Sequence, residues 1–568
     1  MIDAARLAAA AALDDATQRL GVEVWIGGEP TYTVAASTAA PWRHTADDGD
    51  DKRGRAAQVA VALARGSGGV AMAAGGRHFP DEPAPRFCFA VADVAITAAT
   101  PLAPDDPQVM ALLAAAPGGP PASLALTVTP DPGVVEVNMA PCPTLVAFAG
   151  QLAVIDRAAA QAGLAAGRFR FNGDATDSGG GGQLTIGGPT AATSPLFTHP
   201  ALLPRLLRYV HNHPALSYWF LGEYAGSAGQ APRPDEGVRE RADELPLACA
   251  ELEHLAATGA STPALQWQTV APMLCDAAGN AHRAELNVEK LWNPDGGDRG
   301  CLGLVEWRAF RMAPSVEAMV AAAALVRAVT VRCAVAPYQA PWHDWGNALH
   351  HRWALPSELA ADLDEVVADL AAHGLDLGVL AADLAQYRAA PLVDHQVHAA
   401  LHVTLRNAIE FWPLVGDVAS QERATARTVD PSSERLELAV VTDADAPAPR
   451  IVVAGRGVAL AARTPGRYRV GIRRRQFVPS RGLLPTVPAD EPLRITVGDD
   501  RGGLELAVYA WRPDGGGYPG LPADAAEAAA RRAARVVVRP LPTAPPWPPR
   551  VVTPTDTVDV RAWREETP

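Results

Sequence analysis

The stretch GNAHRAELNVEKLWNPDGGDRGCLGLVEWRAFRM, residues 279–312, contains two short runs in which polar and apolar residues alternate. Side chains alternate between the two faces of a β-strand, so each run predicts a strand with one polar and one apolar face. The connector Asn293-Pro-Asp-Gly-Gly predicts a turn between them. The pattern therefore predicts an antiparallel pair with an apolar underside and a charged upper face. The residues of that upper face would be Arg283, Glu285, Asn287, Glu289, Glu306 and Arg308.

The solvated face of an ordinary antiparallel sheet would show the same alternation. Two further strand-like runs favour a functional surface instead. The run at 134–139 places Glu136 and Asn138 on one face of an apolar strand, and Glu29 follows two glycines at the end of the run at 25–31. Four runs with glutamate on the polar side predict a sheet that gathers carboxylates. Such a surface suits a divalent metal ion and a polyphosphate.

Length and composition narrow the class of protein. A chain of 568 residues, 48% of them hydrophobic, is expected to fold as two or three globular domains. The excess of 63 Asp and Glu over 49 Lys and Arg argues against general nucleic-acid binding. The six cysteines are scattered without metal-site spacing, which fits a reducing compartment. With neither a signal peptide nor an apolar run of membrane-spanning length, we expect a cytoplasmic protein without a membrane partner.

The order of patterns along the chain predicts its organisation. Helices are predicted at about 1–20, 144–163, 239–257 and 315–334, and residues 340–412 are expected to continue helical. After about residue 425, short β-rich runs separated by Gly, Pro and Asp predict an all-β module, sandwich-like or barrel-like. We therefore expect a catalytic part at 1–420, a β module at 425–540 and a disordered, proline-rich tail at 541–568.

A run of four glycines, residues 179–182, precedes Gln183 and a short strand-like segment. Composition alone fits a flexible linker, whereas the immediate return to a strand fits a loop whose N–H groups approach an anion. The pattern is neither a P-loop nor a Rossmann fingerprint. The pair His211 and His213 fits helix caps or core-edge residues better than metal ligands. A second group, which we expect on an exposed loop or helix edge, is His395, His398 and His402.

Several segments together resemble one protein family. They occur in the order GGEPTYTV, PGVVEVNMAP, GGGGQLTIGGPTAATSPLF, HPALSYWFLGEYAGSAGQAPRPDE, GNAHRAELNVEKLW, LGLVEWRAF and VDPSSERLELAV. They resemble the amidoligase domain that is commonly attached to bacterial transglutaminase-like proteins, over roughly residues 20–540. The resemblance implies a glutamine-synthetase-like carboxylate–amine ligase. Its fold would be α+β, a curved antiparallel sheet with flanking helices whose concave face binds ATP and magnesium, followed by the smaller all-β domain.

The resemblance also implies roles for individual residues in a reaction that passes through an acyl phosphate. Arg283 and Arg308 would clamp phosphate oxygens or the substrate carboxylate. Gln183 would orient nucleotide or substrate, and Asn138 would contact the nucleotide together with the glycines. Those glycines are Gly180, Gly181 and Gly182. The magnesium ligands would be Glu29, Glu136, Glu285 and Glu306.

The chain departs from the family pattern at several positions. Gly182-Gln183 stands where relatives carry Asn-His, and Arg311 and Ser315 stand where an acidic residue and a histidine are usual. Three hypotheses therefore remain open. The chain is an amidoligase acting on a peptide or a small carboxylate or amine, or it is a degenerate homologue. A degenerate homologue would bind a peptide or a separate transglutaminase-like or ATP-grasp protein. The third hypothesis is an unrelated hydrolase or transferase.

Overall fold

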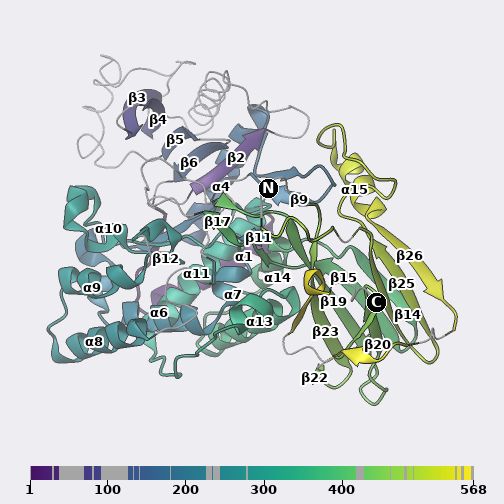
Figure 1. Ribbon diagram of the computed structural model, residues 1–568. Coiled ribbons are helices and arrows are strands. Elements are labelled where there is room, and N and C mark those ends of the chain that lie inside the picture. The colour runs from purple at the N-terminus through teal and green to yellow at the C-terminus, as the bar shows by residue number, and fades with distance from the viewer. Residues whose placement is uncertain are drawn as a thin grey trace.

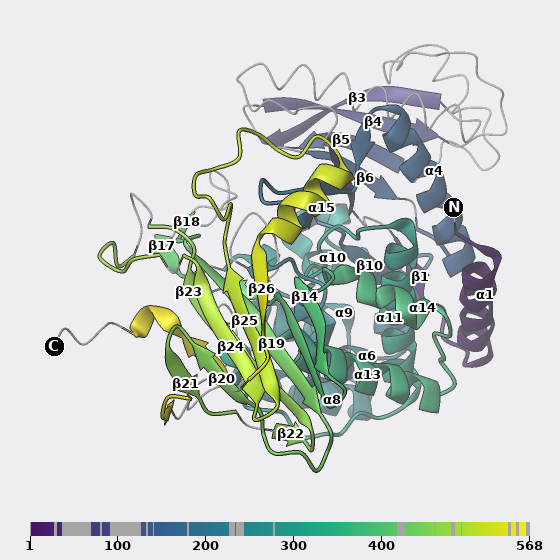
Figure 2. The ribbon, with the colours of Figure 1, turned by 90° about the vertical axis from the view of Figure 1, so that its right-hand side faces the viewer.

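The computed structural model has mixed α and β content built on two hydrophobic cores, and the predicted combination of helices and sheets is confirmed at this level. The helix-rich and β-rich parts lie side by side in two perpendicular views (Figures 1 and 2). A curved sheet of the glutamine-synthetase type stays a prediction. The structure describes residues 2–27, 31–36, 70–79, 82–90, 126–131, 134–139, 141–178, 181–225, 233–234, 243–276, 279–416, 428–460, 462–478, 483–489, 491–543, 547–551 and 556–563.

Helix α11 (Val316–Val335) runs through the first core and packs against several other helices (Figure 1). Alanine occupies four consecutive positions, 321–324, and all four are buried, so neighbouring helices can approach closely. The helix begins at Ser315, whose side chain accepts a hydrogen bond from the Ala318 N–H. Its neighbours include α1 (Ala4–Arg19), α4 (Leu145–Gln161), α6 (Leu202–Asn212), α13 (Pro356–Ala372) and α14 (Leu380–Asp383). The helices predicted near 1–20, 144–163 and 315–334 are confirmed.

By length and composition alone, α11 would be able to cross a membrane, although the sequence predicts no such run. Nearly all of the helix is buried inside the protein. Its two arginines have carboxylate partners on other helices or at their ends, Arg327 with Asp14 at 2.7 Å and Arg332 with Asp369 at 2.8 Å. These are features of the core helix of a folded domain.

A four-stranded antiparallel sheet covers the other side of the first core, in the order β1-β10-β13-β12. The strands are β1 (Trp25–Ile26), β10 (Leu184–Gly187), β13 (Val305–Trp307) and β12 (Leu286–Asn287). The focal stretch thus supplies two paired strands, as predicted, but the first is shorter than predicted. Arg283 lies in the 3-10 helix Ala281–Arg283, and Glu289 begins helix α10 (Glu289–Trp292). The connector holds a second 3-10 helix, Pro294–Arg299, and not a simple turn.

A second antiparallel sheet adjoins the first, in the order β3-β4-β5-β6-β2-β7. Strand β2 pairs with β6, and just upstream Ile26 exchanges two main-chain hydrogen bonds with Cys142, just downstream of β6. The two sheets are therefore linked through this segment. The strands are β3 (Val70–Phe79), β4 (Glu82–Ala90), β5 (Leu126–Asp131), β6 (Val134–Met139), β2 (Thr31–Ala36) and β7 (Leu164–Ala165).

Two six-stranded sheets enclose the second core, and we call them the β module (Figure 2). The first, in the order β14-β15-β19-β23-β22, comprises β14 (Val393–His398), β15 (Leu401–Asn407), β19 (Ser433–Thr442), β23 (Arg467–Arg475) and β22 (Ala462–Thr464), with β28 (Thr557–Asp559) also paired to β23. The second, in the order β26-β25-β24-β20-β21-β27, comprises β26 (Val536–Leu541), β25 (Gly502–Val508), β24 (Leu493–Asp499), β20 (Arg450–Val453), β21 (Arg456–Val458) and β27 (Arg550–Val551).

Two predictions for this region are wrong. Residues 393–407 form β14 and β15 and not a helix, because alternating Leu401, Val403 and Leu405 pack into the second core. The tail is not disordered at 557–559, where β28 pairs with β23 and Val558 is buried. The histidines at 395, 398 and 402 lie on the β14–β15 hairpin.

Buried ion pairs connect the two parts of the molecule. Glu410, fully buried where the chain leaves the first core, lies 3.2 Å from Arg435 of β19 and also pairs with Arg473 of β23. Asp174 of the helix-rich part pairs with Arg535, which follows helix α15 (Ala525–Ala534). Such pairs are costly to separate, since each partner would be left as an isolated buried charge.

Candidate functional site

The register of the four-stranded sheet brings polar residues of three strands into one row. Thr185 of β10 lies opposite Glu306 of β13, which lies opposite Asn287 of β12. All three are buried, and their strand neighbours point into the first core on the opposite face. We call this polar side of β10, β13 and β12 the polar face. It contains Asn287 and Glu306 of the predicted upper face, whereas Arg283 and Glu289 of that prediction lie in helical segments outside these strands.

The charged centre of the polar face is the pair Glu306 and Arg308. Glu306 lies on β13, Arg308 follows directly after the strand, and the Arg308 guanidinium donates to Glu306 Oε1 at 2.7 Å. Each is 7% exposed. The main-chain N–H of Arg308 also donates to the carbonyl of half-buried Glu285 at 2.9 Å, so the backbone of Glu285, just before β12, lies beside that of Arg308. Glu285, Glu306 and Arg308 thus lie near one another, while the roles predicted for them stay predictions.

Gln183 immediately precedes β10 and, by the period of two, shares the side of Thr185. It is 3% exposed, and its amide lies over Gly181, where a Cβ atom would be 2.3 Å from Gln183 Nε2. The absence of a side chain at Gly181 therefore makes room for the Gln183 side chain at the end of the polar face.

His282 and Glu289 flank the polar face. The sequence pattern predicts Glu289 on the charged upper face but indicates no role for it, and it does not single out His282. Their side chains approach to 3.0 Å, and Asn287 Nδ2 donates to the same Glu289 oxygen at 3.1 Å. Asn287 Oδ1 accepts from the Glu289 N–H at 2.8 Å, which starts the helix where the sequence predicts continued strand. The pKa of Glu289 lies below its ordinary value, and the largest cause is the contact with His282. Asn287 and the charge of Arg308 also lower this pKa, although burial raises it. Asn287 two residues before Glu289 is the only sequence signal for this arrangement.

Glu136 and Asn138 lie on β6, in the adjoining sheet. Asn138 Nδ2 donates to Glu136 Oε1 at 2.9 Å, and both side chains are half-buried. Val135, Val137 and Met139, on the other side of the strand, belong to the same core as the apolar face of β13. Glu136 and Glu306 thus both point away from one shared core. Their two sheets are linked through the bridge between Ile26 of β1 and Cys142.

The predicted nucleotide-binding glycines have a different local role where the structure describes them. The Gly182 N–H donates to the Phe310 carbonyl at 3.0 Å, and Gly181 forms a β-bridge with Arg311. A Cβ on Gly182 would lie 2.5 Å from the Arg311 carbonyl oxygen. Gly182 therefore permits close strand packing, and its N–H is already used. Glu29 and Gly180 lie outside the described residues, and Arg283 is half-buried in its 3-10 helix.

Arg311 and Ser315, the two residues after β13 at which this chain departs from the family pattern, both make contacts that hold the fold together. The Arg311 guanidinium donates to the Tyr387 carbonyl and lies 3.8 Å from Asp177. Ser315 caps α11 and donates to Gln386 Oε1 at 2.8 Å. The paired histidines also have structural partners. His211 contacts the His343 carbonyl at 2.8 Å, and His213 contacts Asp362 at 2.8 Å.

Within the described ranges, no group of three or more His, Cys, Asp and Glu side chains could hold a metal ion. Magnesium needs fewer protein ligands than such a group provides, since it commonly takes one or two protein carboxylates and completes its shell with phosphate oxygens and water. Glu306 on β13 and Glu285, just before the paired strand β12, have carboxylate oxygens of the kind that magnesium takes as ligands.

The comparisons with known proteins agree with the segments that carry the resemblance. A family model described as "Putative amidoligase enzyme (DUF2126)" matches residues 113–553. The match therefore includes the polar face and almost all of the β module. No curated protein matches the sequence.

Proposed function

We propose that this chain, which belongs to the amidoligase family, joins a carboxylate to an amine through an amide bond. The reaction takes place on the polar face. The observation that supports the proposal is that the buried Glu306–Arg308 pair lies beside half-buried Glu285 at the two paired strands β12 and β13. Charged groups gathered in this way cost stability and are typical of sites that act on charged substrates.

Amide formation needs an activated carboxylate, because a free carboxylate is a poor electrophile. ATP, as co-substrate, would supply that activation by transferring its γ-phosphate to the carboxylate, which forms an acyl phosphate and releases ADP. Glu285 and Glu306 would hold magnesium, which would supply countercharge to the phosphates. Arg308 donates to oxyanions of the reacting group. Its guanidinium is fixed by Glu306 before substrate binds, so little reorganisation is needed when negative charge develops.

The attacking amine must lose a proton, and we assign its uptake to His282. When His282 donates from Nε2 to Glu289, its Nδ1 atom is left as a proton acceptor. Glu289 remains ionised at neutral pH because its pKa is lowered by that same contact. Gln183 donates or accepts only neutral hydrogen bonds and therefore orients the substrate without moving a proton.

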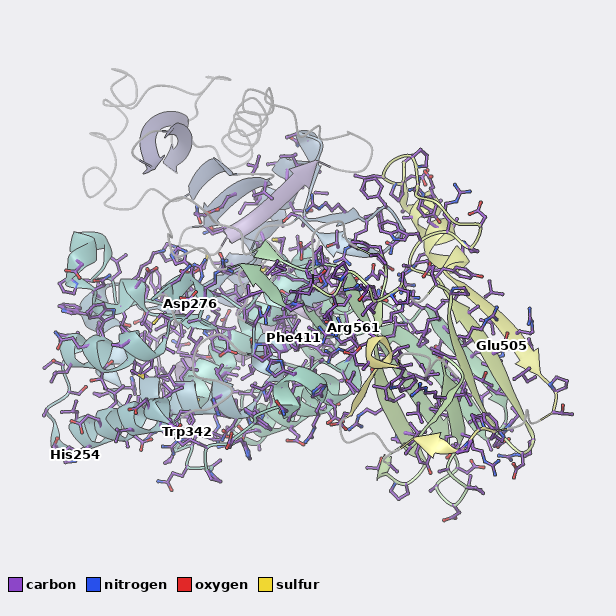
Figure 3. The ribbon with its side chains drawn as sticks, viewed as in Figure 1. His254, Asp276, Trp342, Phe411, Glu505 and Arg561 are labelled. Atoms are coloured by element: carbon purple, nitrogen blue, oxygen red, sulfur yellow. The ribbon has the colours of Figure 1, made fainter. Side chains whose placement is uncertain are left out.

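A product assay tests the proposal. The full chain is incubated with ATP, magnesium, hydroxylamine as the amine and a panel of small and peptide carboxylates, and products are identified by mass spectrometry. We expect a hydroxamate and phosphate in equal amounts. Glu306→Gln should abolish both, whereas Glu505→Gln, a surface carboxylate of the β module (Figure 3), should not. Hydrolysis of a substrate without amide formation would contradict the proposal and favour a hydrolase.

A second function is favoured by one observation. At the positions where the family carries histidines and an acid, Gln183 cannot transfer a proton and Arg311 is bound to a main-chain carbonyl. We therefore consider a binding module that takes up a peptide, or a separate transglutaminase-like or ATP-grasp protein, without turnover. Saturable peptide binding in the absence of nucleotide, with no product in the hydroxylamine assay, would select this alternative.

A further inference from the structure

Four arginines from separate segments gather around residues 218–223. Arg388 donates to the main-chain carbonyls of Tyr218, Trp219 and Leu221. The Arg311 N–H donates to the Phe220 carbonyl at 3.0 Å. The other two, Arg168 and Arg170, lie on and just after β8 (Gly167–Phe169), which pairs with β9 (Ala175–Asp177). We call Arg168, Arg170, Arg311 and Arg388 the arginine patch.

The carboxylates of this patch are fewer than its arginines. Arg170 pairs with Glu223 at 2.9 Å, and Arg311 lies 3.8 Å from Asp177. In the part of the chain that the structure describes, Arg168 and Arg388 donate only to main-chain carbonyls, Arg168 to that of Asp177 at 3.0 Å. The next carboxylate along the chain, Asp174, pairs with arginines 532 and 535. Asp177 also acts on Arg168, and Glu223 acts on Arg388. Among the described residues, two carboxylates therefore face four arginines, which leaves a surplus of two positive charges.

This surplus is partly buried and therefore unfavourable without an anion. Burial and the nearby Arg311 charge lower the pKa of Arg388 to about 9, and burial lowers the pKa of Arg168. The patch is nevertheless accessible, since the side chains of Arg170 and Arg311 are 29% and 16% exposed. A bound oxyanion would pair with the surplus charge, and planar guanidinium groups suit carboxylate and phosphate equally.

The patch adjoins the polar face. Arg311 forms a β-bridge with Gly181, and Gly181 lies under the Gln183 side chain at the end of that face. We propose that the arginine patch binds an anionic group of the substrate, a carboxylate or a phosphate, beside the reacting carboxylate. That the anion belongs to the substrate rests on the proposed function. Anion binding itself does not depend on turnover.

Calorimetric titration of the full chain with inorganic phosphate and, separately, with glutarate tests the proposal, with ionic strength held constant by sodium chloride. We expect saturable binding of at least one anion, and the one that binds identifies the group. Arg168→Gln should weaken that binding by about tenfold or more, as expected for loss of a charge-assisted hydrogen bond. Arg168→Lys, which keeps the charge, should retain part of the affinity.

The matched control is Arg501→Gln, which removes an exposed arginine paired with Asp499 in the β module and should leave the affinity unchanged. Circular dichroism of each variant establishes that it is folded. The proposal is overturned if neither anion binds saturably or if Arg168→Gln binds as tightly as the unmodified chain. The hydroxylamine assay is independent of this result, so a failed anion site and a failed ligase are distinguishable.

Discussion

At the scale of single residues, the pair Glu306 and Arg308 shows why the alternation of polar and apolar residues predicts which side of the sheet a side chain faces. Two charged residues in a predicted strand of apolar neighbours must share a side, and that side had to face away from the core. The same rule failed at Glu289, because the Asn287 side chain accepts a hydrogen bond from the Glu289 N–H and the chain begins a helix there. Side-chain hydrogen bonds of this kind compete with strand pairing and are not visible in a pattern of polarity.

The residue at position 183 gives the first prediction. A histidine there carries a proton or a charge that the present amide does not, so Gln183→His should raise any ATP-dependent amide formation on the order of tenfold to a hundredfold. Steady-state release of phosphate and hydroxamate measures the effect. Gln183→Asn, which keeps an amide, should show no gain. Equal rates for the two variants would show that the reaction does not use a proton or charge at this position.

Gly182 gives a prediction that separates packing from ligand contact. A Cβ at this position would meet the Arg311 carbonyl at 2.5 Å and the Met312 Cα at 2.8 Å, so Gly182→Ala should destabilise the protein by about 1–3 kcal/mol. Gly150→Ala, in the interior of α4 with open space around it, should instead stabilise by about 0.5–1 kcal/mol. Denaturant unfolding measures both. Similar effects for the two substitutions would contradict the packing role.

At the scale of elements, long periodic segments were predictable and short ones were not. The predicted helices near 1–20, 144–163 and 315–334 correspond to α1, α4 and α11, because each buries an apolar surface over four or more turns. Strand β12, only two residues long, exists because β13 pairs with it. The β14–β15 hairpin escaped prediction because its long-range partner, β19, begins only at residue 433. Sequence periodicity carries no information about such partners.

Helix α12 (Ala348–His351), at the boundary with the β module, gives a prediction of pH dependence. Burial first, and then the charges of Arg435, His350 and Arg473, lower the pKa of His351 to about 4, against the effect of Asp556. The unfolded chain binds this proton below about pH 6.5 and the folded chain does not. Stability is therefore fully present above pH 6.5 and falls as the pH drops toward 4.

His351→Gln should remove part of this acid sensitivity. We expect the loss of unfolding free energy between pH 7 and pH 5 to shrink on the order of 1–2 kcal/mol relative to the unmodified chain. Urea unfolding at both pH values measures it. The control is His254→Gln, at an exposed position of α8 (Glu244–Thr258) far from the boundary (Figure 3). An unchanged pH profile in His351→Gln would contradict burial of a neutral imidazole.

At the scale of the whole molecule, the chain is two cores connected by buried ion pairs. The sequence indicated a helix-rich part and a β-rich part from their periodicities, but not the charges between them. Glu410, Arg435 and Arg473 appear in the sequence as ordinary charged residues, and only the fold brings them together. The predicted disorder of the tail rested on its proline content, which overlooked the isolated apolar residues Val558 and Val560 that the second core buries.

Truncation tests how the tail contributes to the β module. A chain that ends at residue 551 loses β28 and with it two valines that are 2% and 4% exposed. Burial of one valine contributes roughly 1.5–3 kcal/mol, so we expect a loss of about 3 kcal/mol or more. Thermal unfolding measures the change. A midpoint equal to that of the full chain would show that β28 does not stabilise the module.

Magnesium-dependent binding of ATP is the measurement that tests the ligase account most directly. In calorimetric titrations of the full chain, we expect ATP to bind in the presence of magnesium and not in its absence. Glu306→Gln should abolish this binding and Glu505→Gln should preserve it, because only the first belongs to the polar face. If the unmodified chain binds no nucleotide with magnesium present, the ligase account is contradicted and the binding module takes its place.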